Sequence, residues 1–429
     1  MVLLDLVQRV YCAFNPPTPV KKNDAIRIGL LGASNIAPFS VINAAKSHSE
    51  VIVVAVAARD RERARQYAEK HDIPIVHDSY QALIDDPSVN AVYIALPNSL
   101  HYEWSLRSLK AGKHVLLEKP SCSNAEEARK LFNHPLVTAP NAPVILEAFH
   151  YQFHPAWQTF LSQVHQSPYG GAVKHVSSSF YLPKSYLTLD DIRFKYGMAG
   201  GCLMDLGTYP LSCVRQVLGR EVRLHPVTAQ HKPLPPAADG SAREPQIDAG
   251  VSATYRTDKG QTAQIDGDLL RGGGWSLSPL SWAKGLGLEW PVTHATLEEA
   301  LVDSQDDGAQ HFVQRNVTLW NQMLPWFYHR IDVCDTHVLR RQGRDVKTWK
   351  ETKYLKAYNW PAGDERANVY RDWWTTYRCQ LEEFVNRIKV RKGSGVWVDG
   401  NESIAQMEAI DATYAQLGLK SRPTTAVEI

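Results

Sequence analysis

The sequence predicts an α/β protein in which a Rossmann-type, doubly wound parallel sheet is followed by an α+β domain with a large open, mostly antiparallel sheet. Up to about residue 148, apolar strands alternate with amphipathic helices, which is the pattern of a parallel sheet covered on both faces. Beyond that point, strand-like segments predominate. Because 429 residues exceed one ordinary core, we expect a first domain over 25–148 and a second over 149–429.

A short amphipathic helix and a linker are expected before the first domain, in residues 1–24. Apolar residues recur there at helical spacing: Leu3, Leu6, Val7, Val10 and Phe14. This stripe predicts a helix that packs on the main body, with attachment to a membrane surface as the alternative. The segment PPTPVKKND behind it has the composition of a linker. The unbroken apolar core of a secretion signal is absent from this segment, and we expect no membrane span.

Five buried strands and two crossover helices are predicted within the first domain. The strands are expected at 26–32, 51–58, 91–97, 114–120 and 143–149, and each is rich in aliphatic residues. The helices are expected at 61–72 and 101–113. Ligands of such sheets bind at the carboxyl ends of the strands, so functional residues are expected directly after each strand.

The second domain is predicted to combine helices with one open sheet. Strands are expected at 174–183, 248–257 and 261–270, with extensions at 315–324 and 336–342. Helices are expected at 154–166, 375–388 and 403–418. The proline-rich stretch 221–245 is predicted to be a surface loop, and the segment 272–310 matches no pattern that predicts its role.

Composition and charge exclude several classes of partner. A net charge of +2 gives no electrostatic reason to expect nucleic acid or an anionic membrane. The six cysteines form neither CxxC pairs nor Cys/His ligand spacings, which predicts reduced thiols, a cytoplasmic protein and no metal site.

The first strand leads into a turn whose sequence resembles a dinucleotide-binding loop. Against the template GxGxxG, Gly32 is kept, while Ser34 and Ala37 replace the second and third glycines. Small residues at these points let the backbone approach a pyrophosphate, and the following helix offers amide donors. A plain tight turn has a similar sequence, but the position after the first strand of a βαβ unit favours dinucleotide binding. Asn35 and Ile36 belong to the same loop.

The end of the second strand, Ala-Ala-Arg59-Asp60, bears on the choice of dinucleotide. A carboxylate at this position usually binds the ribose 2′-hydroxyl of NAD, whereas an arginine favours the 2′-phosphate of NADP. Since Arg59 comes first, we predict NADP as the cofactor. NAD remains the alternative through Asp60, which has the further option of capping the next helix.

Lys119 directly follows the fourth strand, and Pro120 fixes the backbone after it. Proline ends the strand and keeps the preceding residue extended, and a new helix begins near Ser123 or Asn124. Lys119 is therefore expected at a strand-to-helix junction, which is where α/β folds place their chemistry.

A second informative cluster lies within DIRFKYGMAGGCLMDLGTYP. Gly200 and Gly201 are expected to begin a helix on which Asp205 and Tyr209 share one face. Together with Lys119, these side chains suit the removal of a proton from an alcohol. Lys119 would lower the pKa of Tyr209, which then accepts the proton, while Asp205 orients the substrate. The alternative is that Asp205 caps the helix and Tyr209 fills the core.

Four motifs resemble the glucose–fructose oxidoreductase/inositol dehydrogenase family: GASNIA at 32–37, LPNSLH at 96–101, AGKHVLLEKP at 111–120 and GGxxxDxGxY at 200–209. Within that family, the chain is most similar to the branch of dimeric dihydrodiol dehydrogenases and fungal NADP-dependent D-xylose 1-dehydrogenases. The segments AVAARD and GSGVWVDGNESIAQ fit the same branch. The resemblance covers 25–220 well and 370–425 fairly.

The resemblance implies a Rossmann domain, an open sheet that often forms a dimer contact, and catalysis by Lys119 and Tyr209 beside Asp205. Pro120 would often be cis. We assign to the cofactor site Gly32, Ser34, Asn35, Ile36, Arg59, Leu96, Pro97, Asn98, His101, Glu118 and Lys119. We assign to the substrate site Lys119, His150, Arg193, Asp205 and Tyr209. For His101, capping of its own helix is the alternative.

We therefore predict an NADP-dependent oxidoreductase of sugars or polyols that forms a homodimer or higher homo-oligomer. The first interpretation is oxidation of an aldose C1, as in D-xylose, to a lactone. Alternatives are oxidation of a trans-dihydrodiol, reduction of a carbonyl on a specialised metabolite, and, in another class, a catalytically silent dinucleotide-binding regulator. Gln152 stands where close relatives carry an arginine, so a positive contact at the site is expected to be missing.

Overall fold

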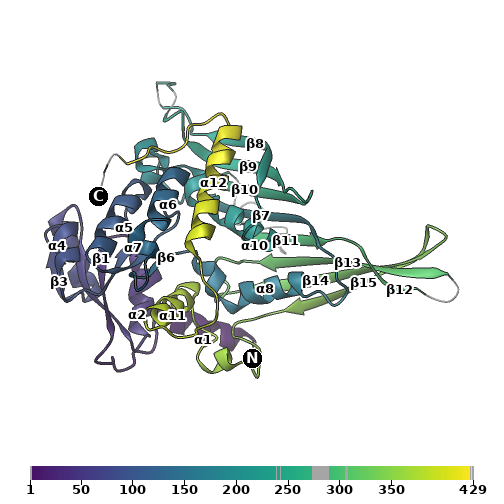
Figure 1. Ribbon diagram of the computed structural model, residues 1–429, viewed down its shortest axis with the longest axis horizontal. Coiled ribbons are helices and arrows are strands. Elements are labelled where there is room, and N and C mark those ends of the chain that lie inside the picture. Colours follow the sequence, from purple (N-terminus) through teal and green to yellow (C-terminus); the bar gives the residue numbers. More distant parts are fainter. Residues whose placement is uncertain are drawn as a thin grey trace.

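The structure, a computed structural model, describes residues 2–237, 239–241, 243–272, 289–304, 308–425 and 427. Two sheets lie side by side along the long axis of the molecule (Figure 1). The smaller sheet, built from the N-terminal part of the chain, is parallel, and the larger one is mostly antiparallel. The predicted fold class is therefore confirmed. None of the helices within these residues is long and apolar enough to cross a membrane.

The first sheet has the strand order β3-β2-β1-β4-β5-β6, with every pair parallel. The strand order reverses between β1 and β4, which is where folds of this kind bind their ligands. Its strands are β1 (Ile26–Leu31), β2 (Val51–Ala57), β3 (Ile75–His77), β4 (Ala91–Ile94), β5 (His114–Leu117) and β6 (Ile145–Glu147). Most of their residues are buried, as expected of strands covered on both faces.

The helices of this domain are η1 (Pro38–Ile42), α2 (Asn43–Lys46), α3 (Arg61–His71), α4 (Tyr80–Asp85), α5 (His101–Lys110), α6 (Ala125–Phe132) and α7 (Pro135–Thr138). All five predicted strands and both predicted helices are confirmed. The sequence did not predict β3 or α4, because three and six residues are too few to establish a period.

The second sheet has the order β15-β14-β13-β11-β7-β10-β9-β8, and β12 pairs with β13. Among the described pairs only β7 and β10 are parallel. Its strands are β7 (Val173–Pro183), β8 (His225–Pro233), β9 (Asp248–Arg256), β10 (Thr262–Arg271), β11 (Val292–Leu297), β12 (Ala300–Ser304), β13 (Ala309–Trp320), β14 (Arg330–Arg341) and β15 (Arg344–Leu355).

The prediction of a surface loop over 221–245 was wrong, because β8 lies within it and pairs with β9. β8 is an edge strand whose residues are mostly exposed, and Pro226 and Pro233 interrupt its ladder, so it lacks the apolar alternation of a half-buried strand. Part of the segment 272–310 forms β11 and β12, whereas residues 273–288 and 305–307 lie outside the described residues.

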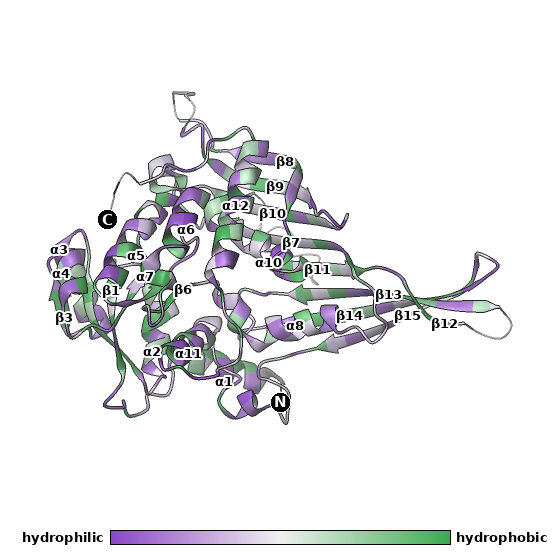
Figure 2. Cartoon of the chain, viewed as in Figure 1, coloured by the Kyte–Doolittle hydropathy of each residue, from purple (hydrophilic) through white to green (hydrophobic). Residues whose placement is uncertain are grey.

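Helices cover one face of the second sheet. Helix α10 packs on β7, β10 and β11, and α8 packs on β13 and β14, while residues alternate between buried and half-buried along these strands. Figure 2 shows the corresponding alternation of hydrophobic and hydrophilic residues. The helices of this domain are η3 (His150–Phe153), α8 (Pro155–His165), η4 (Ile192–Phe194), η5 (Tyr196–Met198), α9 (Cys202–Asp205), α10 (Thr208–Leu218), η7 (Glu365–Asn368), α11 (Thr376–Ile388) and α12 (Gly400–Gln416).

The N-terminal segment forms α1 (Val2–Phe14), as predicted, but only part of the expected stripe packs on the body. Arg9 and Ala13 are buried, and the Arg9 guanidinium lies 3.7 Å from the ring centroid of Tyr358. Val7 and Phe14, expected in the packed stripe, are 58% and 55% exposed. A cation–π contact, which hydropathy does not register, thus helps to hold the helix, together with contacts of the Phe14 ring with Phe39 and Trp326.

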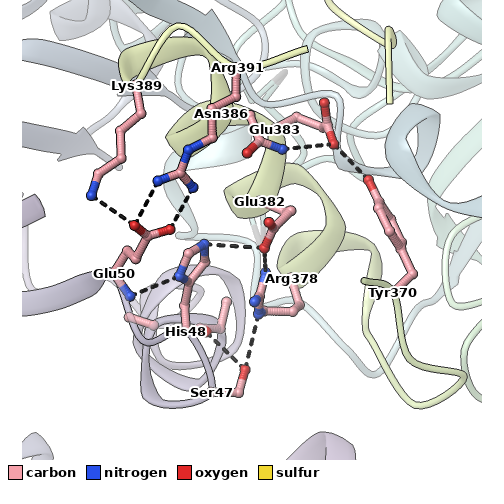
Figure 3. Close-up of polar contacts among 12 residues, drawn as sticks. Ser47, His48, Glu50, Tyr370, Arg378, Glu382, Glu383, Asn386, Lys389 and Arg391 are labelled. Atoms are coloured by element: carbon pink, nitrogen blue, oxygen red, sulfur yellow. Dashed lines mark hydrogen bonds and ion pairs between the residues drawn. The ribbon is translucent and has the colours of Figure 1, made fainter. Parts of the chain in front are cut away.

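A network of ion pairs joins α11 to the loop between α2 and β2 (Figure 3). Glu50 is paired with Lys389 at 2.9 Å and with Arg391 at 2.7 Å. In the same network, the Nε2 atom of His48 lies 3.2 Å from Glu382, which also pairs with Arg378 at 2.8 Å. These contacts fasten α11, a helix of the second domain, to the first domain.

We predict that Glu50→Gln lowers the free energy of unfolding by about 3 kcal/mol, the scale for removing one partner of a buried ion pair. The hydrogen bond from Arg391, joined by those from Lys389 and Lys22, outweighs burial and holds the pKa of Glu50 below its usual range. Its contribution is therefore present above the unfolded glutamate pKa of about 4.3 and is lost as pH falls further.

Urea denaturation at neutral and acidic pH measures this effect. Glu408→Gln is the control, because Glu408 forms an ion pair with Arg129 in which both side chains are about half exposed, and such pairs contribute about 0–1 kcal/mol. Equal stability of the Glu50 variant and the wild type would contradict the role of the network.

Candidate active site

The turn after β1 has the geometry that a dinucleotide-binding loop needs. Gly32 has a φ of +103°, and a Cβ at this position would lie 3.1 Å from the Ala95 carbonyl oxygen. Only glycine adopts this conformation without strain, so β1 and β4 approach each other closely at the switch point. Asn35 and Ile36 are exposed beyond the turn, and the residues present fit a bound dinucleotide.

Two side chains of α3 hold this turn, and neither was predicted from the sequence. Arg63 donates from Nη2 to the Ala33 carbonyl at 2.9 Å, and the Tyr67 hydroxyl donates to the Ser34 carbonyl at 2.9 Å. Both contacts bridge about thirty positions of chain, beyond the reach of a local pattern. They make the turn a fixed surface rather than a loose connection.

Arg59 and Asp60 have different roles at the end of β2. The Asp60 side chain accepts a hydrogen bond from the backbone N–H of Arg63 at 3.0 Å and thereby caps α3. Asp60 therefore caps the helix, which was the alternative to binding the ribose of NAD. Arg59 is exposed at the carboxyl end of the strand, so its guanidinium is accessible to a phosphate.

The loop after β4 is held by side-chain contacts of Asn98 and His101. Asn98 donates from its side-chain amide to the Ala199 carbonyl of the second domain at 3.0 Å, and Pro97 is half-buried beside it. The ring of His101 is fully buried, with Nδ1 2.8 Å from the Pro120 carbonyl and Nε2 3.0 Å from the Leu96 carbonyl. His101 therefore joins the ends of β4 and β5 through its side chain, and neither ring nitrogen faces a cofactor.

Lys119 reaches from the end of β5 into the second domain. Its ammonium group donates to a carboxylate oxygen of Asp205 at 2.9 Å and to the Asp205 carbonyl at 2.8 Å. The peptide bond between Lys119 and Pro120 is cis, in line with the resemblance. Two of the three N–H donors of the ammonium are thus engaged by one residue, which leaves one donor for a ligand.

Asp205 is shared between two cations. Arg193 donates from Nε to its second carboxylate oxygen at 2.7 Å. Burial favours the neutral acid, but the charges of Lys119 and Arg193 outweigh it and hold the pKa of Asp205 well below its usual range. Asp205 is therefore a permanent carboxylate that fixes Lys119 in place.

The sequence predicted that Asp205 and Tyr209 share one helix, but the structure places them on two. Helix α9 ends at Asp205 and α10 begins at Thr208, because Gly207 donates its backbone N–H to the Cys202 carbonyl at 2.7 Å and breaks the regular ladder. Both side chains nevertheless lie next to Lys119.

The start of α9 is held by a buried ion pair. Gly201 has a φ of +124°, and a Cβ there would collide with Arg422 and Asp248. Arg422 and Asp248 form a fully buried pair at 2.7 Å, and Asp248 also accepts the backbone N–H of Leu203 at 2.7 Å. The double glycine thus serves close packing with the C-terminal segment.

Tyr209 lies under Lys119, whose Nζ is 4.8 Å from the ring centroid. The hydroxyl oxygen of Tyr209 is 3.1 Å from Nε2 of His150. Burial raises the pKa of Tyr209 well above its usual value, and neighbouring Tyr377 and Glu118 add to the rise. The pKa of Tyr209 is therefore raised and not lowered as expected, because burial outweighs the effect of the neighbouring ammonium.

Glu118 belongs to a buried hydrogen-bond chain beneath the site. The hydroxyl of Tyr93 donates to a carboxylate oxygen of Glu118 at 2.6 Å and lies 2.7 Å from the Ser40 hydroxyl. Burial raises the pKa of Glu118. Tyr93 was not predicted, because within the strand AVYIALP it is indistinguishable from a core residue.

Gln152, where an arginine was expected, packs against α12. Gln152 is fully buried and donates to Glu402 at 2.8 Å. Glu402 also lies 3.3 Å from Arg220, and Arg215 binds Gln406 of the same helix, α12. Gln152 therefore belongs to the packing of α12.

Comparisons with known proteins agree with this architecture. The oxidoreductase family with an NAD-binding Rossmann fold matches residues 26–135, and the GFO/IDH/MocA C-terminal domain matches residues 161–279. The fold and the site thus define an oxidoreductase that pairs a dinucleotide-binding domain with an α+β domain. The chain belongs to the GFO/IDH/MocA oxidoreductase family.

Relatives include several sugar-related enzymes. An NADP-dependent D-xylose 1-dehydrogenase of Haloferax volcanii is 36% identical over 240 residues, 56% of this chain and 68% of that protein. A dTDP-3,4-didehydro-2,6-dideoxy-alpha-D-glucose 3-reductase of Streptomyces violaceoruber is 35% identical over 48% of this chain. The trans-1,2-dihydrobenzene-1,2-diol dehydrogenase of Sus scrofa is 34% identical over 53% of it. The matched parts span 58% and 63% of the last two relatives, less than two thirds of each.

Among solved structures, the 3-ketoreductase KijD10 from Actinomadura kijaniata, in complex with NADP and TDP-benzene, aligns with a TM-score of 0.63 and 22% identity. The alignment covers 91% of this chain and 98% of KijD10. At this identity the likeness concerns the fold, which extends over both domains.

We predict that Arg59→Ala weakens the binding of NADP by about tenfold or more, the scale of a lost hydrogen bond to a charged group, and that of NAD much less. Dissociation constants of both dinucleotides, measured by fluorescence titration, provide the comparison. Arg61→Ala is the control, since the exposed Arg61 is already paired with Asp78 at 2.7 Å. Equal losses for NADP and NAD would refute the role of Arg59.

Proposed function

We propose that this protein is an NADP-dependent oxidoreductase that transfers hydride between nicotinamide and a sugar or polyol carbon. The first candidate reaction is oxidation of an aldose C1, as in D-xylose, to a lactone. The observation that carries the proposal is the convergence of Lys119 and Tyr209, from different domains, at the carboxyl edge of the parallel sheet. The 36% identity to a D-xylose 1-dehydrogenase supports the choice of sugar.

Each residue has a distinct task in this proposal. NADP, when bound, would accept the hydride. The remaining donor of Lys119 would bind the substrate oxygen and stabilise negative charge on it. Asp205 orients Lys119 through two hydrogen bonds. Tyr209 would exchange the hydroxyl proton, and its raised pKa means that oxidation should accelerate as pH rises.

A second candidate, reduction of a carbonyl, is favoured by the protonated state of Tyr209. Because burial raises the pKa of this phenol, its resting form is an acid that can protonate the oxygen of a ketone. Among the relatives, the 3-reductase is named for a reduction and the dihydrodiol dehydrogenase for the oxidation of an alcohol. A silent regulator would need no such proton-exchanging group, so we favour an enzyme.

We expect Lys119→Ala and Tyr209→Phe each to lower kcat by about 10²–10⁴-fold, the usual scale for loss of acid–base assistance. The absorbance of NADPH reports turnover on a panel of pentoses, hexoses and dihydrodiols for oxidation, and of keto sugars for reduction. Lys130→Ala, an exposed lysine paired with Glu126, should leave kcat unchanged. Intact NADP(H) binding without turnover on any substrate would instead support the regulator.

A further inference from the structure

The hydroxyl of Tyr209 is connected to the start of α11 through one histidine. Nε2 of His150 lies 3.1 Å from that hydroxyl, and Nδ1 of the same ring lies 2.7 Å from the hydroxyl of Thr376. His150 is 3% exposed and Thr376 is fully buried. The ring of Tyr377 packs on His150 at a tilt of 31°, with centroids 4.0 Å apart, which restricts the plane in which the imidazole donates and accepts.

The imidazole carries a single proton. Burial, with a contribution from the charge of Lys119, lowers the pKa of His150 to about 3, so the ring is neutral at physiological pH. Since both partners are hydroxyls, two arrangements satisfy the chain while Tyr209 is protonated. Once Tyr209 loses its proton, its oxygen can only accept, so Nε2 must donate and Nδ1 must accept from Thr376.

His150 is the only partner that the described residues give to this hydroxyl. The ammonium of Lys119 lies over the ring face and is engaged by Asp205. The other titratable or charged groups that face Tyr209 come from η3, α9, α11 and the end of β5; they are Tyr151, Asp205, Tyr377 and Glu118. None of these four favours a phenolate. The positive charge of Lys119 favours it from the ring face, and His150 is the group placed to donate a hydrogen bond to the oxygen.

We propose that His150 and Thr376 are positioning residues for Tyr209: the Thr376 hydroxyl donates to Nδ1 of His150, and Nε2–H of His150 donates to the Tyr209 oxygen. The pair thereby holds the deprotonated tyrosine during oxidation of the substrate. This inference rests on the proposed function, because it takes Tyr209 as the group that exchanges the proton. The network of Figure 3 holds the helix that carries Thr376.

The test is the pH dependence of kcat/KM for oxidation, from about pH 6 to the highest pH at which the protein stays folded, because the raised pKa of Tyr209 puts the limb at the alkaline end. In the wild type, kcat/KM should rise along one ascending limb. Thr376→Val and His150→Phe should move that limb to higher pH by about one unit, so that kcat/KM falls about tenfold at pH values below it. Thr376→Ser, which keeps the hydroxyl, should restore the wild-type limb.

Thr413→Val is the matched control, because Thr413 is also fully buried and contacts a tyrosine hydroxyl, that of Tyr255, at 2.9 Å, away from the site. An unmoved limb in Thr376→Val, whether kcat/KM is unchanged or reduced equally at every pH, overturns the inference. The variant Tyr209→Phe distinguishes a wrong role for His150 and Thr376 from a wrong proposed function. If Tyr209→Phe keeps both the activity and the limb, the assignment of Tyr209 itself is wrong.

Discussion

Lys119 forms the contact on which the geometry of the site depends, an ion pair with Asp205 that crosses from one domain to the other. The two side chains are only 11% and 20% exposed, so neither charge is well solvated, and each would be costly without its partner. Arg193 adds a second cation to the same carboxylate. The ammonium is consequently held between the parallel sheet and the second domain, where a nicotinamide and a substrate oxygen can both reach it.

Several unrelated contacts protect this arrangement. His101 lies between the Pro120 and Leu96 carbonyls and donates its single N–H to one of them. Arg422 and Asp248 fasten the start of α9, and the ion pairs around Glu50 and Glu382 fasten α11. Buried polar groups with satisfied partners are rigid, and rigid supports keep reacting groups at productive distances. The interior charges of this protein therefore serve orientation at the site more than stability alone.

Local sequence patterns predicted a large part of this site. The turn at Gly32, the lysine before Pro120 and the pair Asp205 and Tyr209 are marked by residues within a few positions of one another, so short-range spacing reveals them. The contact between His150 and Thr376 joins positions 226 residues apart, so no local sequence pattern could predict it. The raised pKa of Tyr209 was also unpredictable, because it depends first on how completely the folded chain buries the phenol. The edge strand β8 was not predicted, because exposed strands lack the alternation of apolar residues that marks a half-buried strand.

The central claim is that Lys119 and Tyr209 act on the same substrate atom over a nicotinamide ring. A crystal structure of the protein with NADP and a bound sugar measures this most directly. The account predicts that the Lys119 ammonium and the Tyr209 hydroxyl both lie within about 3 Å of the reacting oxygen, with the carbon that bears it facing the nicotinamide. A sugar bound elsewhere, or a nicotinamide separated from Tyr209 by the protein, would contradict it.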